Sequence, residues 1–368
     1  MKSRLEKMAR VIINYSTSVK PKDKVLLRGT SPAAEPLIQA LYREALQAGA
    51  YAFTYIHLRD EDRLVMESTH DIALLEKVNP MLELMYKTCD VIIRVNAPEN
   101  LHALMHYPSE LQQARLKANG ELMLIQMERE GNGTLRRCST QFPMATYAEA
   151  AEMPFDEYEV FFYRACKLYE DDPISAWKEQ ATIQQKFVDY LNGKKHIKIK
   201  GKNIDMEMSI DGRQFINADA TANFPDGEIF TGPVEDSVNG WVRITYPAYY
   251  GGNKVVGIEL TFENGLVSKA TAEENEAFLY QALNTDAGSR RLGEFAIGTN
   301  RDINRFTASV LFDEKIGGTV HMALGQGYRK TGSINQSLIH WDMICDMRDG
   351  GKIWVDDVLF YKNGDFIV

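Results

Sequence analysis

Residues 188–201, Val-Asp-Tyr-Leu-Asn-Gly-Lys-Lys-His-Ile-Lys-Ile-Lys-Gly, mark the point at which the chain changes its secondary-structure pattern. The helical pattern that precedes them ends at Asn192-Gly193, because a glycine just past a periodic stretch is a usual helix stop signal. From His196 onward, apolar and polar residues alternate with a period of two, which is typical of half-buried strands. The sequence therefore predicts two domains of different fold class, residues 1–192 and residues 193–368.

Toward the N-terminus, short apolar stretches alternate with helical ones. Strands are predicted at 24–28, 50–56, 90–95 and 121–125, and helices at 34–48, 72–86 and 109–119. Strands that alternate with helices of this length indicate βαβ units, so we expect an α/β domain with a mostly parallel sheet. The chain contains neither a GxGxxG nor a GxxxxGK[ST] motif, and it therefore lacks the turns that hold phosphates in dinucleotide and P-loop sites.

Toward the C-terminus, the pattern predicts an antiparallel, β-rich α+β domain, and the polar segments described below make it the candidate catalytic domain. Alternating stretches occur at 196–201, 206–210, 242–246, 255–262 and 353–355. Asn264-Gly265 and Asn363-Gly364 are strong hairpin-turn signals between such stretches. One helix, at 272–283, interrupts them.

The composition excludes several classes of protein. The 368 residues include 42 Lys+Arg and 51 Asp+Glu, a formal net charge of −9, and this acidic balance argues against a nucleic-acid binder. No apolar stretch of about 18 residues occurs, so we expect no membrane partner. The N-terminal residues have an amphipathic helical pattern instead of the apolar core of a signal peptide, which predicts a cytoplasmic protein. The four cysteines form no CxxC pair, and we expect reduced, buried thiols.

Five segments of the second domain contain polar residues that a β-rich core does not need. They are 223–233 with Glu228, 291–300 with Glu294, 311–315 with Glu314, 321–328 with His321 and Tyr328, and 337–346 with His340 and Asp342. On a strand, His340 and Asp342 project from the same face. Glu294 lies in an apolar stretch, where an unpaired carboxylate costs several kcal/mol, so we expect a cation to face it. Such a mixed set of carboxylates and histidines is preferred by zinc, cobalt or manganese.

A separate pair, His102 and His106, has the i, i+4 spacing of two metal ligands on one helix face. The segment lacks the adjacent glutamate of the HExxH motif. Partly exposed helix histidines are therefore the simpler interpretation.

The five segments, in this order, resemble the thermophilic metalloaminopeptidases of the aminopeptidase T and aminopeptidase S type. The matching stretches are Pro-Asp-Gly-Glu-Ile-Phe-Thr-Gly-Pro (225–233), Leu-Gly-Glu-Phe-Ala (292–296), Leu-Phe-Asp-Glu (311–314), His-Met-Ala-Leu-Gly-Gln-Gly-Tyr (321–328) and Ile-His-Trp-Asp-Met (339–343). The resemblance extends more weakly over the N-terminal half. It implies a metal-dependent aminopeptidase that removes the N-terminal residue from short peptides, uses two divalent ions (zinc, cobalt or manganese) and forms a homodimer.

The resemblance also assigns roles to individual residues. The implied ligands of the two-metal centre are Glu228, Glu294, His321, His340 and Asp342, with Glu294 as the bridging carboxylate. Tyr328 is implied to donate a hydrogen bond to the developing oxyanion. The proton carrier is either Glu314 or Glu294, and Glu314 is alternatively a further ligand. The spacings from 314 to 321 and from 321 to 340 differ from the commoner family pattern, which affects the assignment of Glu314 most.

Two other functions stay open at this point. The same fold family includes ring-cleaving dioxygenases with one non-heme iron, and His321, His340 and Asp342 would supply such a triad. Glu228 and Glu294 favour the dinuclear hydrolase, because an iron triad does not need them. The third function is that of a catalytically degenerate, peptide-binding homologue.

Overall fold

The computed structural model describes residues 3–101 and 107–368, which form two compact units. The first unit comprises Met1–Ser175 and Ala220–Pro225, and the second comprises Ala176–Asp219 and Asp226–Val368. This division differs from the predicted boundary at 192/193, because helix α9 (Pro173–Leu191) lies largely in the second unit. Val188 and Leu191 of this helix belong to the hydrophobic core of that unit.

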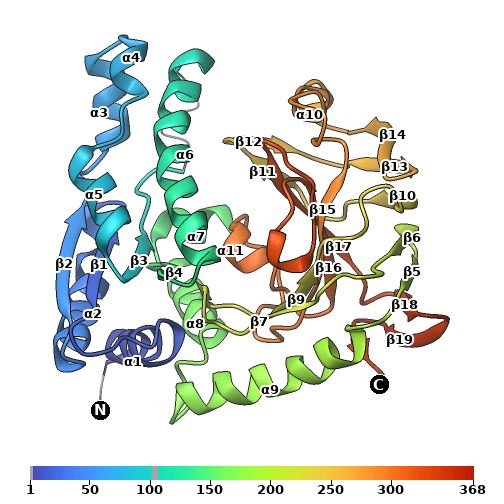
Figure 1. The fold of residues 1–368 in the computed structure, drawn as a ribbon, viewed down its shortest axis with the longest axis horizontal. Helices are drawn as coiled ribbons and strands as arrows, with labels where there is room; N and C mark the ends of the chain where they lie inside the picture. Colours follow the sequence, from blue (N-terminus) through green and yellow to red (C-terminus); the bar gives the residue numbers. More distant parts are fainter. Residues whose placement is uncertain (1–2, 102–106) are drawn as a thin grey trace. The chain divides into compact units, whose positions relative to one another are not determined.

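The first unit is built on a five-stranded parallel sheet with the strand order β2-β1-β3-β4-β8, of which Figure 1 labels the first four strands. Its strands are β1 (Lys24–Gly29), β2 (Tyr51–Ile56), β3 (Val91–Asn96), β4 (Arg136–Gln141) and β8 (Asn223–Phe224). Its helices are α1 (Arg4–Val11), α2 (Glu35–Gln47), α3 (Glu61–Ser68), α4 (Ile72–Leu75), α5 (Pro80–Thr88), α6 (Ser109–Gly131), α7 (Ala145–Ala150) and α8 (Phe155–Ala165). The predicted α/β class with a parallel sheet is confirmed.

The strand order reverses at β1, because β2 lies on one side of it and β3 on the other. Right-handed crossovers that run in opposite directions place their helices on opposite faces of a sheet. Helix α2 accordingly packs on β1 and β2 and against α1, whereas α5 and α6 cover the other face. There Leu82 and Leu122 bury Leu26 and Ile92 of the strands.

The predicted strand at 121–125 is wrong, since these residues belong to helix α6. Leu122 and Ile125 are three positions apart, so they lie on one helix face and pack into the cluster formed with α5. The fourth strand is instead β4, whose sequence Arg-Arg-Cys-Ser-Thr-Gln is polar. Its arginines form ion pairs, Arg136 with Asp23 at 2.7 Å, and the strand therefore lacks the apolar pattern of a buried strand.

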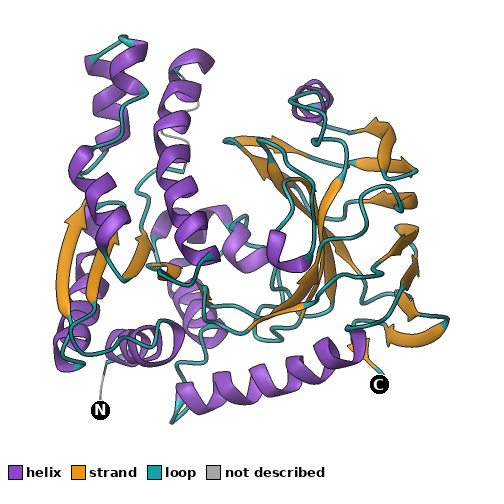
Figure 2. Cartoon of the chain, in the orientation of Figure 1, coloured by secondary structure: helices purple, strands orange, loops and turns teal. Residues whose placement is uncertain are grey.

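The second unit is dominated by two antiparallel sheets, which Figure 2 shows as orange arrows with few helices among them. The eight-stranded sheet contains, in spatial order, β14 (Leu266–Thr271), β13 (Glu259–Glu263), β10 (Asn239–Arg243), β6 (Ile204–Ser209), β5 (His196–Gly201), β18 (Lys352–Val355), β19 (Val358–Lys362) and β20 (Asp365–Phe366). The five-stranded sheet contains β17 (His340–Asp346), β16 (Thr319–Gly325), β15 (Leu292–Gly298), β9 (Glu228–Thr231) and β7 (Ile216–Ala218). The smaller elements are β11 (Ala248–Tyr250), β12 (Asn253–Val255), α10 (Glu276–Leu283) and α11 (Val310–Asp313).

The two large sheets share one hydrophobic core. Ile199 and Phe262 of the eight-stranded sheet and Phe295 and Met322 of the five-stranded sheet belong to the same buried cluster. The hairpin turn at Asn264-Gly265 connects β13 and β14 as predicted. The antiparallel, β-rich class of this part of the chain is confirmed.

Two further expectations concern cysteines and membrane spans. Cys89, Cys138, Cys166 and Cys345 are all buried thiols that form no disulfide, as predicted. Within residues 3–101 and 107–368, no helix has the length and apolar character needed to cross a membrane.

Candidate metal centre

One face of the five-stranded antiparallel sheet in the second unit carries the polar residues that the sequence analysis identified. Side chains alternate between the two faces of a strand. Phe295, Met322 and Trp341 point into the hydrophobic core. Their chain neighbours Glu294 on β15, His321 on β16 and His340 on β17 therefore lie on the opposite face.

The strand register brings these side chains together and gives each of them a small neighbour. Residues directly opposite each other on adjacent antiparallel strands share a face. The cross-strand partners are Gly298 for Glu228, Ala323 for both Glu294 and Asp342, Ala296 for His321 and Gly325 for His340. All five candidate ligands thus stand beside a glycine or an alanine, which leaves the space above the sheet to the ligand atoms. A bulge between Leu292 and Glu294 shifts the register at the position of Glu294.

The two glycines among these partners are also required by the backbone. A Cβ at Gly298 would overlap the carbonyl oxygen of Ile316. Gly325 has a φ of +97°, and a Cβ there would overlap the carbonyl oxygen of Ile339. Glycine adopts this backbone region without strain, so the neighbours of Glu228 and His340 are small for reasons of backbone geometry as well.

The candidate ligands form two groups that share Glu294. The first group is Glu228, Glu294 and His321, the second is Glu294, His340 and Asp342, and the ligand atoms within each group lie within 4.8 Å of one another. The two oxygens of Glu294 divide between the histidines. Oε1 lies 3.8 Å from His321 Nε2, and Oε2 lies 3.3 Å from His340 Nε2.

Each histidine also faces a second carboxylate. His321 Nε2 lies 3.2 Å from Glu228 Oε2, and His340 Nε2 lies 3.5 Å from Asp342 Oδ1. Burial lowers the pKa of His321, but Glu228 and Glu294 outweigh this and raise it to about 9. Burial alone would raise the pKa of Glu294, and the two facing histidines hold it below its ordinary value instead. Glu294, for which the sequence predicts a facing cation, therefore faces two, the rings of His321 and His340.

Several atoms of the cluster are suited to a metal ion. Glu228 Oε2, His321 Nδ1 and Asp342 Oδ1 are buried without a hydrogen-bond partner. His340 Nδ1 lies 2.7 Å from the carbonyl oxygen of Gln326, a hydrogen bond that leaves Nε2 free to ligate. Buried polar atoms are rarely left unpaired, so these residues fit divalent ions well.

Lys315 is a site residue that the sequence interpretation did not identify. Its ammonium is 1% exposed and lies 2.6 Å from Glu228 Oε1, 2.7 Å from Glu314 Oε2 and 3.8 Å from Asp226 Oδ1. Burial lowers the pKa of Lys315, but Glu228, Glu314 and Asp226 hold it well above its ordinary value. The lysine lies in the segment 311–315, yet sequence alone does not show which way its side chain points.

Glu314 and Tyr328 border the two groups. Burial raises the pKa of Glu314 to about 8 against the opposing effect of Lys315, and the negative charge of Asp342 adds to the increase. The Tyr328 ring packs against the His340 ring with 5.3 Å between centroids. The charge of His340 lowers the pKa of Tyr328, whereas burial and the carboxylates of Glu294 and Asp342 together raise it above its ordinary value. The phenol therefore stays protonated and able to donate a hydrogen bond.

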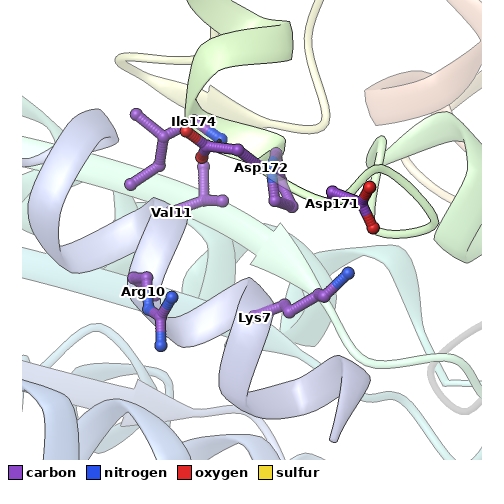
Figure 3. A pocket seen from close by; sticks show the side chains of 7 residues that line it. Lys7, Arg10, Val11, Asp171, Asp172 and Ile174 are labelled. Atoms are coloured by element: carbon purple, nitrogen blue, oxygen red, sulfur yellow. Dashed lines mark hydrogen bonds between the residues drawn. The ribbon is translucent and has the colours of Figure 1, made fainter. Parts of the chain in front are cut away.

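A pocket in the first unit is less suited to catalysis than the metal centre. A pocket of about 240 Å³ in the first unit (Figure 3) is lined by Lys7, Arg10 and Asp172 among others. Lys7 already donates to the carbonyl oxygens of Leu168 and Glu170, so this pocket has a structural explanation. His102 and His106 lie outside the described residues.

Comparisons with known proteins point to one family. A family model described as thermophilic metalloprotease (M29) matches residues 1–366. Aminopeptidase 2 of Geobacillus stearothermophilus is 27% identical, over 94% of this chain and 92% of that protein. The structure of wild-type AmpT from Thermus thermophilus shares the fold with a TM-score of 0.87 at 24% identity, over 99% of both chains. A 2,5-dihydroxypyridine dioxygenase from Pseudomonas putida also shares the fold, with a TM-score of 0.61 at 15% identity over 100% of this chain and 99% of that one.

Proposed function

This chain belongs to the thermophilic metalloprotease family (M29), and from that premise we propose that it is an aminopeptidase that removes the N-terminal residue from short peptides with two divalent metal ions. The observation that carries the proposal is the sharing of Glu294 by two ligand groups. A carboxylate with one oxygen in each group is suited to bridge two ions. The implied ligands are Glu228, Glu294 and His321 for one ion and Glu294, His340 and Asp342 for the other.

The charges of the cluster also favour divalent ions. The two ligand groups contain three buried carboxylates, those of Glu228, Glu294 and Asp342. Histidines bind a metal ion in their neutral form, so Lys315 beside Glu228 would be the positive charge left near them. Divalent ions would supply the remaining positive charge, which a buried cluster of carboxylates needs.

The residues of the site would have different roles in peptide hydrolysis. Two divalent ions at this site would polarise the peptide carbonyl and acidify a water molecule. The carboxylates orient the free α-amine of the substrate. Tyr328 donates a hydrogen bond to the oxyanion, and Glu314, whose pKa is raised to about 8, transfers a proton to the leaving amine.

Removing the Tyr328 hydroxyl tests its role as the hydrogen-bond donor to the oxyanion. We expect Tyr328→Phe to lower kcat about 10²–10³-fold with little change in KM, because the hydrogen bond forms mainly in the transition state. Steady-state kinetics on a leucyl dipeptide measures both constants. A kcat within threefold of wild type would remove Tyr328 from the mechanism.

The dioxygenase function is not favoured by the arrangement of its three would-be ligands. His321 groups with Glu228 and Glu294, while His340 and Asp342 form the other group. A single iron bound by His321, His340 and Asp342 would have to draw its ligands from both groups. It would also leave the buried carboxylate of Glu228 without a role.

The decisive experiment measures metal content and peptide cleavage on one purified sample. We expect about two metals per chain, and release of the N-terminal residue from leucyl, aspartyl or aromatic dipeptides with zinc, cobalt or manganese that stops on addition of chelator. The same dipeptides with an acetylated amine are the control and should not be cleaved. One iron per chain without cleavage would favour the dioxygenase, and neither metal nor cleavage would favour the peptide-binding homologue.

We also propose a homodimer. The edge strand β2 exposes Tyr51 (59%) and Phe53 (45%), and helix α2 exposes Leu46 (49%). Exposed apolar side chains on an unpaired strand edge favour association with another chain. Light scattering coupled to gel filtration should give about twice the mass of one chain, and a monomer mass would contradict the proposal.

A further inference from the structure

The first unit places two arginines side by side where its strand order reverses. Arg28 of β1 and Arg94 of β3 are register partners across this parallel pair, which Figure 1 shows as adjacent strands. Both side chains lie on the sheet face that also carries Leu26 and Ile92, two positions earlier in each strand. Like charges on neighbouring positions of a sheet destabilise it, so this pairing requires a compensating interaction.

The contacts of Arg28 do not supply an anion. Arg28 is buried, and its Nη1 donates to Tyr86 Oη at 2.9 Å while its Nε donates to His57 Nε2 at 3.2 Å. A nitrogen that accepts this bond belongs to a neutral imidazole, and His57 Nδ1 then donates to Glu61 at 2.8 Å. Both direct partners of the guanidinium are therefore neutral. A buried charge of this kind is costly unless it is balanced.

The side chain of Arg94 is exposed and makes no hydrogen bond or ion pair with any residue in the described ranges 3–101 and 107–368. The same row across the sheet continues with hydroxyl groups. Tyr55 of β2 is the register partner of Arg28, and Ser139 of β4 is the register partner of Arg94. Four hydrogen-bond donors thus stand in a row over four strands.

The topology marks this place as a binding position. In open α/β sheets, ligands bind beyond the carboxyl ends of the strands, at the point where the strand order reverses. Here that point lies between β1 and β3. Arg28 is the second-to-last residue of β1, and Arg94 lies in the last half of β3.

We propose that Arg28 and Arg94 form a binding site for an oxyanion, that is, a carboxylate or phosphate group. Guanidinium groups bind both anions through paired N–H donors. Tyr86 and His57 fix Arg28 in place, and exposed Arg94 is the adjustable donor. Two sources share this chemistry: free phosphate, and the C-terminal carboxylate of a peptide. The proposal is independent of the metal centre, because it concerns residues of the first unit alone.

Calorimetric titration of the full chain at low salt tests the proposal. The probes are inorganic phosphate, N-acetyl-diglycine with a free carboxylate, and N-acetyl-diglycine amide. We expect one saturable site per chain for at least one of the two anions, no binding of the amide, and binding at least tenfold weaker in Arg94→Met. The control is Arg63→Met, which removes a partly exposed arginine already paired with Glu67 at 2.8 Å and should leave binding unchanged.

Each result of the titrations either supports or contradicts the oxyanion site. Binding of phosphate that depends on Arg94 assigns the site to phosphate, and Arg94-dependent binding of the peptide carboxylate assigns it to peptides. No binding of either anion, or equal weakening in the Arg63 and Arg94 variants, would overturn the proposal. Arg94→Lys keeps the charge without the paired donors and should bind with intermediate affinity. An unchanged thermal unfolding midpoint will show that the exposed Arg94 variants remain folded.

Discussion

Replacing Glu294 by glutamine is expected to lower kcat/KM by about 10³-fold or more and to reduce the metal content from about two ions per chain to one or fewer. The reason is the position of this side chain, whose two oxygens belong to different ligand groups. Glutamine keeps the shape of the side chain but offers one neutral oxygen. Elemental analysis and dipeptide kinetics on the same preparation measure both effects.

A matched control comes from the eight-stranded sheet. Glu263→Gln makes the same chemical change at an exposed position of β13, and its activity should stay within twofold of wild type. Two metals per chain in Glu294→Gln, together with more than a tenth of the activity, would contradict the bridging role.

The second large effect is expected from Lys315→Met in the metal-free protein. We expect the free energy of unfolding to fall by about 3–5 kcal/mol, because removing the ammonium leaves Glu228 and Glu314 without their buried counter-charge. Bound divalent ions would supply positive charge in its place, so the loss should be smaller with metal present. Urea unfolding with and without metal measures the two values.

Two comparison variants separate charge from packing. Lys200→Met removes a half-exposed lysine that pairs with Asp205, and it should change stability by less than about 0.5 kcal/mol. Adding Glu314→Gln to Lys315→Met removes one of the unbalanced carboxylates and should restore part of the lost stability. No restoration would show that Lys315 acts through its volume and not its charge.

The fold was predictable where local pattern and tertiary role agree. The parallel strands at 24–28 and 90–95 are apolar because both faces are covered, and they were correctly identified. The stretch at 121–125 was misassigned because Leu122 and Ile125 are apolar for a helix face, and a short apolar run does not distinguish the two cases. The polar strand β4 carries no such signal, since ion pairs and neighbouring strands stabilise it.

The site was predictable in its residue types but not in its arrangement. His340 and Asp342 share a strand, so their common face follows from a period of two. The meeting of Glu228 with His321 depends on the register of three strands, which no local pattern contains. Lys315 was missed for a related reason, because the burial of a lysine beside Glu314 is decided by segments distant in sequence.

The small residues beside the ligands restrict which substitutions this protein can accept during evolution. Each candidate ligand has an alanine or a glycine as its neighbour on the next strand, and Ala323 is the neighbour of two of them. A larger side chain at Ala296 or Ala323 would fill the space in which the ligand atoms meet. Natural variation that adjusts substrate preference is therefore expected in the loops around the sheet, while these four neighbours stay small. A library randomised at Ala323 should return alanine, glycine or serine among active clones.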